Sequence, residues 1–353
     1  KSDGLLNTKI IFIAIILSIL LLSSLFLLSN SEIRYGILQD VGIKLKPKII
    51  DSSYTMEFVG SGLPAPYYLG SIGNDVFFNE RFTGNLYVIK NGNFQDQPII
   101  NVSIENEQTQ IMGIASGSSS IFIHVTEVDY EEEEDQFRNN RVLEYSWNGK
   151  NLNFIQEVTP QILFTDPHHS GGITMDEDEN IFSTYPYIIE EHLFNYFAYG
   201  VHGMDHEITT NTIWHTSELD EVVDGAVVGI DGKIHSVSMD NIKNHKFWIV
   251  PYYPNSLHIP DTDSSNGHQN SIYVGFCQGK ETKGGILKYP LNSQKTDFSI
   301  SYTKENFKEI DHFKYLMAKD FYCVSDIEPG PEGSLFVTDY TKTGAIYKIV
   351  PKS

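Results

Sequence analysis

A short strand-like phrase that recurs six times after residue 70 constrains the fold of this chain most. Each copy begins in a turn rich in Gly, Asn, Asp or Ser and continues into apolar and β-branched residues. The copies are Gly73–Phe78, Ser118–Ile123, Asp178–Ser183, Asp231–Ser236, Asn270–Gly275 and Glu332–Val337. Their spacing averages about 52 residues, close to the ~40 to 50 residues per repeat that are typical of β-propellers.

A second phrase follows most of these copies and supplies the partner strand that each sheet needs. Its side chains alternate between apolar and polar, which predicts one face in a core and one face outward. The copies are Gly84–Gly92, Asn140–Gly149, His245–Val250, Gly284–Asn292 and Gly344–Val350. Helical periodicity is weak and confined to residues 305–318. We therefore expect an all-β, six-bladed β-propeller; a β-sandwich with accidental self-similarity is the alternative.

Composition limits the domain count and the class of partner. The 353 residues include 20 Tyr and 21 Phe, enough apolar surface for one large core. The net charge is -21, from 46 acidic and 25 basic residues. Because a phosphate backbone repels an acidic surface, this balance opposes binding to nucleic acid.

The N-terminus contains a stretch that differs from everything after it. Residues 10–28 carry no charge, while Lys9 precedes the stretch and Arg34 follows it. Nineteen uncharged, mostly apolar residues are long enough to cross a bilayer as a helix, so the sequence predicts a transmembrane helix that acts as an uncleaved signal anchor. A cleaved signal peptide is the alternative, with Ser24 or Ser29 at the cleavage site.

The basic residues before the stretch predict its orientation. Lys1 and Lys9 favour a cytoplasmic location for residues 1–9, so the protein is expected to be single-pass with the propeller outside the membrane. Residues 29–56 are then predicted to form a stalk, and residues 57–353 the propeller.

The chain has two cysteines, Cys277 and Cys323. An extracytoplasmic compartment permits a disulfide between them. Both lie in strand-like phrases, where two buried free thiols are equally compatible with the sequence. The sequence alone leaves both alternatives open.

Eight phrases, taken in their order and approximate spacing, resemble a known family. They are Phe58–Gly70, Gly84–Ile100, Gln108–Ala115, Asn140–Leu152, His168–Ile173, Tyr196–Gly203, Asn270–Phe276 and Ser325–Ile349. From about Glu57 to its end, the chain is similar to the glucose/sorbosone dehydrogenase family. These six-bladed propellers include soluble quinoprotein glucose dehydrogenase and aldose sugar dehydrogenases. The resemblance implies oxidation of aldose sugars, with pyrroloquinoline quinone and calcium as cofactors.

The resemblance also implies catalytic residues. His169 matches the family's base, which takes the proton from the anomeric hydroxyl of the sugar while a hydride moves to the quinone. A histidine suits this role because its pKa lies near neutrality. Gln108 matches a polar residue at the same end of the tunnel, and His168 lies in the same phrase as the base.

The cofactor phrase of the family is only partly kept. Tyr199 and Gly200 match its beginning, but His202 and Gly203 stand where the family has Arg and Asn. A protonated His202 can carry part of the charge-stabilising role, although it lacks the guanidinium fork that suits a planar acidic cofactor. We therefore expect His202 to assist the base.

Two further departures concern calcium and the last blade. Glu218, Asp220 and Glu221 stand near the family's calcium loop, whose Gly-Pro-Asp part is missing here. Such carboxylates are suitable calcium ligands, so the sequence predicts a calcium site here. The alternative is that these residues form a solvated acidic loop without a metal ion. In the last blade, where active relatives have cofactor-binding arginines, this chain has residues 321–325 with the sequence Phe-Tyr-Cys-Val-Ser.

Two functions from different classes follow from these observations. The first is a membrane-anchored sugar dehydrogenase, indicated by His169 on a matching scaffold. The second is a non-catalytic propeller that binds a glycan, an envelope component or a protein partner, indicated by the departures. A metal-dependent lactone hydrolase would need a carboxylate and Asn cluster around the central channel, which the sequence does not identify.

Overall fold

A computed structural model provides the structure of the chain. It describes residues 46–81, 83–103, 108–129, 136–158, 173–175, 181–184, 194–197, 201–207, 212–217, 222–223, 226–227, 233–238, 245–249, 254–260, 270–277, 284–301, 309–341 and 343–352. The predicted membrane segment, residues 10–28, lies outside these ranges. Within them, no helix has the length and apolar character needed to cross a membrane.

The described part of the chain is all-β. Its helical elements are two short 3-10 turns, η3 (His312–Tyr315) and η4 (Pro331–Gly333). The weak helical pattern of residues 305–318 therefore becomes, where it is described, a 3-10 turn that leads into a strand. The strands form six larger sheets in chain order, together with a separate hairpin of β17 (Val222–Val223) and β18 (Ala226–Val227).

The first three sheets are formed within residues 66–197. The first contains β3 (Pro66–Ile72), β4 (Asp75–Glu80), β5 (Asn85–Lys90), β6 (Asn93–Phe94) and β7 (Ile100–Asn101). The second contains β8 (Gln108–Ser116), β9 (Ser120–Asp129), β10 (Gln136–Trp147) and β11 (Leu152–Glu157). The third contains β12 (Ile173–Met175), β13 (Ile181–Thr184) and β14 (Phe194–Phe197), and its β13 and β14 are parallel.

The last three sheets are antiparallel throughout. The fourth contains β15 (Val201–Glu207), β16 (Thr212–Ser217), β19 (Lys233–Ser238) and β20 (His245–Ile249). The fifth contains β21 (Pro254–His258), β22 (Ser271–Phe276), β23 (Gly284–Pro290), β24 (Leu316–Phe321) and β1 (Lys48–Ile49). The sixth contains β25 (Ile327–Pro329), β26 (Leu335–Asp339), β27 (Thr343–Pro351) and β2 (Tyr54–Pro64).

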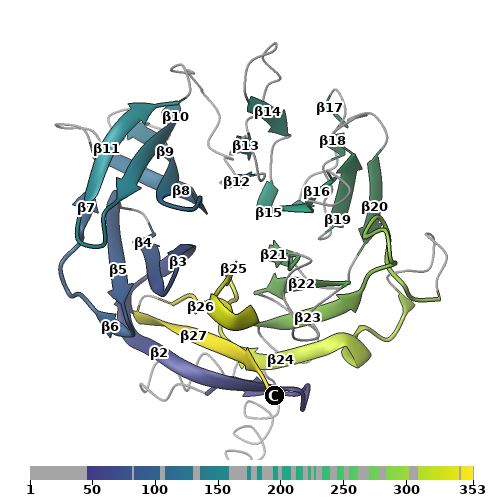
Figure 1. The fold of residues 1–353 in the computed structure, drawn as a ribbon. Coiled ribbons are helices and arrows are strands. Elements are labelled where there is room, and N and C mark those ends of the chain that lie inside the picture. The colour runs from purple at the N-terminus through teal and green to yellow at the C-terminus, as the bar shows by residue number, and fades with distance from the viewer. Residues whose placement is uncertain are drawn as a thin grey trace, which may run out of the picture.

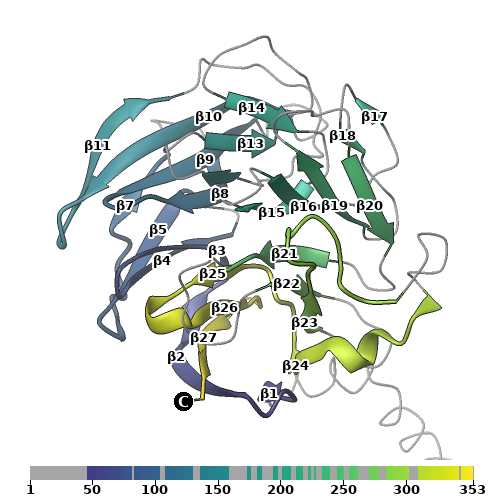
Figure 2. The same cartoon turned by 45° about the vertical axis from the view of Figure 1, so that its right-hand side comes forward.

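The six sheets follow one another around a common centre (Figure 1). The first strand of each sheet contacts the first strand of the next, in the order β3, β8, β12, β15, β21 and β25. β25 in turn contacts β3, and Figure 2 shows these two strands beside each other. The six first strands therefore contact one another in a cycle that begins and ends at β3.

The repeated phrase of the sequence forms the second strand in five sheets, namely β4, β9, β13, β22 and β26, and the third strand β19 in the fourth sheet. The turn between β3 and β4 shows why such copies begin with turn residues. Gly73 has a φ of +60°, a conformation that glycine adopts without steric cost. In the first sheet the repeat therefore marks a tight hairpin between the first and second strands.

The alternating pattern predicted that one face of each partner strand is exposed, but several of these strands are buried on both faces. Four consecutive residues of β5, Leu86–Ile89, are buried, and so are the first four residues after Thr343 in β27. The reason is that each sheet packs between two others. Residues Ile121, Ile123 and Val125 of the second sheet, for example, share a core cluster with Phe77 of the first.

The N-terminal strands join the sheets formed by the end of the chain. β2 pairs with β27 from Tyr54 opposite Pro351 to Pro64 opposite Thr343. β1 pairs with β24 in the neighbouring fifth sheet, with Lys48 opposite Lys319. The segment that leads into the first sheet therefore pairs with two adjacent sheets, the fifth through β1 and the sixth through β2 (Figure 2).

A polar network supports this N-terminal segment. The Lys288 ammonium donates a 2.7 Å hydrogen bond to the Tyr54 hydroxyl and lies 3.7 Å from the Asp51 carboxylate. The Tyr54 and Tyr273 hydroxyls are 3.1 Å apart. Burial and then the neighbouring Tyr54 and Asp51 raise the pKa of Tyr273, so this phenol stays neutral and can remain hydrogen-bonded inside the core. Burial alone would raise the pKa of Asp51, but hydrogen bonds from Ser53 and the charge of Lys288 lower it overall.

Candidate functional site

Antiparallel pairing brings one set of chain segments to the same end of the sheets. The start of each first strand lies beside the end of its second strand, as shown by Pro66 opposite Glu80 and Pro254 opposite Phe276. The same holds for Gln108 opposite Val128 in the second sheet. We call this end, defined by the residues that precede or begin the first strands, the site end.

Two of the residues implied by the resemblance have described backbones at the site end. Gln108 is the first residue of β8, and His202 lies in β15 within a register shift between Val201 and Met204. The remaining candidates lie outside the described residues; they are His168, His169, Tyr199, Gly200, Glu218, Asp220 and Glu221. Within the described ranges, no group of three or more His, Cys, Asp or Glu side chains is arranged to hold a metal ion.

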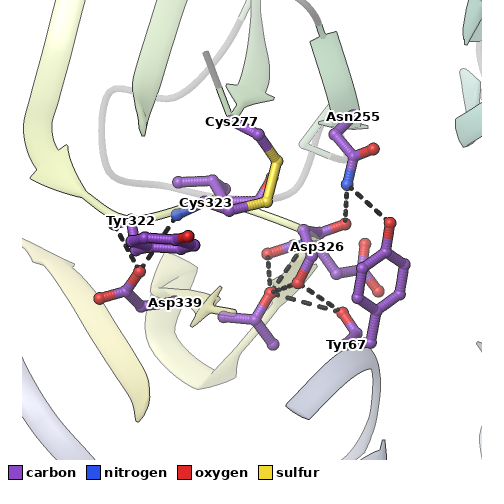
Figure 3. The surroundings of a disulfide bond; sticks show 10 residues. Tyr67, Asn255, Cys277, Tyr322, Cys323, Asp326 and Asp339 are labelled. Carbon is purple, nitrogen blue, oxygen red and sulfur yellow. Dashed lines mark hydrogen bonds between the residues drawn. A yellow bond between two sulfur atoms is a disulfide. The ribbon is translucent and has the colours of Figure 1, made fainter. Parts of the chain in front are cut away.

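At the site end, the first, fifth and sixth sheets are joined by a hydrogen-bonded cluster that we call the seam. It consists of Tyr67, Asn255, Ser325, Asp326 and Thr338 (Figure 3). The Asn255 amide donates to the Tyr67 hydroxyl at 3.4 Å and to the Ser325 carbonyl at 3.3 Å. The Ser325 hydroxyl donates to the Tyr67 carbonyl at 2.9 Å. Tyr67 of the first sheet, Asn255 of the fifth sheet and Ser325, which shortly precedes the sixth sheet, are therefore each bonded to the other two.

Asp326 extends the seam to the backbone. One carboxylate oxygen accepts the Leu69 N–H of β3 at 2.7 Å, and the other accepts the Ile327 N–H of β25 at 2.9 Å. The Asp326 N–H donates to the Thr338 hydroxyl at 2.7 Å. Hydrogen bonds from N–H groups to a carboxylate are stronger than those between neutral groups, so Asp326 is a main link between the first and sixth sheets.

Tyrosine rings surround a positive charge beside the seam. The Arg81 guanidinium lies 4.2 Å from the ring centre of Tyr67 and 4.9 Å from that of Tyr340. The two rings meet edge to face, with centres 5.0 Å apart. Burial acts to lower the pKa of Arg81, but the neighbouring Tyr67 and Tyr340 raise it overall, so the group stays charged. These contacts are cation–π interactions that fix the guanidinium.

The two cysteines form a disulfide at the site end. Cys277 directly follows β22, and Cys323 lies in the segment that joins β24 to β25. The Asp339 carboxylate accepts the N–H groups of Tyr322 at 2.7 Å and Cys323 at 3.3 Å (Figure 3). Both cysteines are described and neither is free, so the alternative of two buried thiols is wrong. The close approach of β22 to the start of the sixth sheet accounts for the pairing.

The described residues of the site end do not fit an acidic quinone. In residues 321–325, where the family has cofactor-binding arginines, the structure places Cys323 of the disulfide. The nearby carboxylates of Asp326 and Asp339 are bound to backbone N–H groups. The guanidinium of Arg81 lies nearby but is stacked against two tyrosine rings. A multiply acidic cofactor needs several cationic partners, which the described part of this end does not supply.

Sequence reasoning did not identify the seam. Its residues lie far apart in the sequence, such as Tyr67 in β3 and Asn255 in β21, and Ser325 and Asp326 belong to no strand. The available signal was a polar residue inside an apolar run, as at Thr338, which is fully buried in β26. That signal indicates a satisfied buried polar group but not the identity of its partner.

Comparison with known proteins shows a likeness of fold. No family model and no curated protein matches the chain. A solved structure of a glucose dehydrogenase is 13% identical, with a TM-score of 0.54 over 85% of this chain and 100% of that one. The apo form of soluble aldose sugar dehydrogenase from Escherichia coli is 12% identical, with a TM-score of 0.52 over the same shares. A family AA12 carbohydrate-active enzyme from Trichoderma reesei is 11% identical, with a TM-score of 0.55 over 87% and 98%.

The resemblance to soluble glucose dehydrogenases and aldose sugar dehydrogenases is therefore confirmed at the level of fold. Identities of 11% to 13% carry no information about individual site residues.

Proposed function

We propose that this chain is a membrane-anchored, extracytoplasmic six-bladed propeller of the sugar dehydrogenase type, which takes a sugar at its site end. The observation that carries the proposal is the cycle of contacts among the first strands of six consecutive sheets. The likeness to two sugar dehydrogenase structures over 85% of the chain supports it. Ligands commonly bind where loops from several such sheets meet, because the scaffold below them is rigid.

The disulfide supports the extracytoplasmic part of the proposal. Disulfides persist in oxidising compartments and are rare in the cytosol, where thiols are kept reduced. The bond between Cys277 and Cys323 therefore agrees with a domain outside the membrane. The uncharged residues 10–28 would serve as the anchor, and Lys9 would favour the orientation with the propeller outside.

Oxidation of an aldose is the first candidate activity. It assigns His169 as the base that accepts the proton of the anomeric hydroxyl, with Gln108 and His202 assisting. The described backbones of Gln108 and His202 begin first strands at the same end, which supports this grouping. Pyrroloquinoline quinone would supply the hydride acceptor, and calcium would be bound beside it. They would be held by candidates outside the described residues, namely Tyr199, Gly200 and His168 for the quinone and Glu218, Asp220 and Glu221 for calcium.

Recognition of a sugar or glycan without oxidation is the second candidate function. One observation favours it: the segment where relatives have cofactor-binding arginines here contributes a disulfide and the seam residues Ser325 and Asp326. A neutral sugar needs hydroxyl, amide and aromatic groups, and it does not need a set of cations. Aromatic and amide groups of this kind are present here, namely Tyr340 beside the seam and Asn255 within it.

Cofactor titration separates the two candidates. The purified full chain in detergent is titrated with pyrroloquinoline quinone and calcium by calorimetry, and dye reduction is then followed with a panel of aldoses. Oxidation requires cofactor binding and aldose-dependent reduction, and His169→Ala should slow the reduction ~10²- to 10⁴-fold because it removes the base. Asn74→Ala, in the turn at the opposite end of the first sheet, should leave the rate unchanged. Absence of cofactor binding would eliminate the oxidation candidate and leave sugar recognition.

A further inference from the structure

The disulfide holds the chain segment that contains the seam residues Ser325 and Asp326. It links Cys277, at the end of β22 in the fifth sheet, to Cys323, two residues before Ser325. The bonded cysteines are 46 residues apart in the sequence. Cys277 is half-buried and Cys323 is 7% exposed. A reductant can therefore approach the bond from the Cys277 side.

The segment held by the disulfide has little regular structure of its own. Residues 323–326 belong to no strand, so no β-ladder fixes them. Single backbone hydrogen bonds attach it, such as Tyr340 N–H to the Cys323 carbonyl at 2.8 Å and Val324 N–H to the Phe276 carbonyl at 3.4 Å. The order of this segment therefore depends on such individual hydrogen bonds, on those of the seam and on the disulfide, and not on a β-ladder.

The same segment carries the bonds that join the sixth sheet to the first. Ser325 donates to Tyr67, and Asp326 accepts the Leu69 N–H. Val324 of this segment is fully buried in the apolar core between the fifth and sixth sheets, together with residues of other segments such as Tyr273, Ile286 and Val337. Release of residues 323–326 would therefore loosen the seam and withdraw Val324 from this core, while the strand residues of the core keep their contacts with one another.

We infer that the Cys277–Cys323 disulfide is a redox-sensitive clasp that keeps the seam ordered and so regulates the site end. A dithiol reductant supplies two electrons and two protons, the S–S bond breaks into two thiols, and the dithiol becomes its own disulfide. In the reduced protein the 323–326 segment loses its covalent tether, and the Asp326 bonds to Leu69 and Ile327 open more often. The effect on sugar binding rests on the proposed function, whereas the effect on the seam does not.

Hydrogen exchange of the full chain in detergent tests the clasp. Exchange is followed by mass spectrometry with and without a phosphine reductant. Reduction should speed exchange about tenfold or more in peptides that contain Leu69 and Ile327, the amides bound to Asp326. Peptides from β23, which is buried in the fifth sheet, should not change. Unchanged exchange at Leu69 and Ile327, or a uniform increase over all sheets, would overturn the proposal.

Two variants control the experiment. Because the chain has only two cysteines, the double variant Cys277→Ser/Cys323→Ser should show fast seam exchange with and without reductant. Asp326→Asn keeps the disulfide but weakens the charged acceptor, so it should speed exchange at Leu69 in the oxidised protein. A double variant whose seam exchanges as slowly as the oxidised wild type would contradict the clasp.

Sugar affinity measured in both redox states separates this inference from the proposed function. Faster seam exchange together with sugar binding weakened at least about tenfold in the reduced protein supports regulation of the site end. Faster exchange with unaltered sugar affinity contradicts the regulatory part. Faster exchange in a protein that binds no sugar leaves the clasp intact and rejects the proposed function.

Discussion

A variant that begins at Ala65 should fail to fold, whereas a variant that begins at Lys46 should fold like the full-length propeller. The first deletion removes β2, an eleven-residue strand that pairs along the length of β27 in the sixth sheet. It also removes Tyr54 and Leu63, which are buried in the cores of the closing sheets. Loss of a whole strand should exceed the ~5 to 15 kcal/mol by which ordinary domains are stable.

Circular dichroism and thermal melting of the two truncated proteins measure this effect. The variant that begins at Lys46 keeps β1, β2 and the contacts of Asp51 and Lys288, so it serves as the matched control. A cooperative melt of the Ala65 variant close to that of the control would show that β2 is dispensable. It would contradict the role of the N-terminal strands in closing the ring.

Replacing Phe321 with Ala should destabilise the protein far more than replacing Phe58 with Ala. Both rings meet Tyr347 edge to face, with centres 5.8 Å and 5.7 Å away. Phe321 is fully buried between the fifth and sixth sheets, whereas Phe58 is 56% exposed on β2. We expect a cost of ~3 to 5 kcal/mol for Phe321→Ala from lost burial and the cavity left behind, and under ~1 kcal/mol for Phe58→Ala.

Chemical denaturation of both variants provides the comparison. Because the two substitutions remove the same side chain and the same type of aromatic contact, their difference reports burial alone. Equal costs would mean that the core between the fifth and sixth sheets is not packed as described. Such a result would also remove the basis for treating the two sheets as neighbours in the ring.

The sequence contained enough information for the number and order of the sheets. The phrase that begins at Gly73 recurs in the sequence of each sheet, and this local signal does not depend on distant partners. The strands before residue 57 were not anticipated. β1 has only two residues, and its partner Lys319 lies far along the chain. No local pattern can reveal a strand whose stability comes from such a distant sheet.

The site was less predictable than the fold. Resemblance led to Gln108 and His202, and their strands begin at the same end. The seam could not be found in this way, because Tyr67, Asn255 and Ser325 meet only when three sheets come together. The disulfide illustrates the same limit: the sequence gives two cysteines, but only the packing of β22 against the sixth sheet places them together.

Direct sugar binding is the measurement that tests the central claim. Saturation-transfer NMR of the full chain in detergent, with a panel of aldoses and oligosaccharides, should detect at least one bound sugar. Substitution at the site end, as in Gln108→Ala or Asn255→Ala, should weaken that binding, whereas Asn74→Ala at the opposite end should not. Absence of binding by every sugar tested, or binding that only the Asn74 variant weakens, would contradict a sugar site at this end of the propeller.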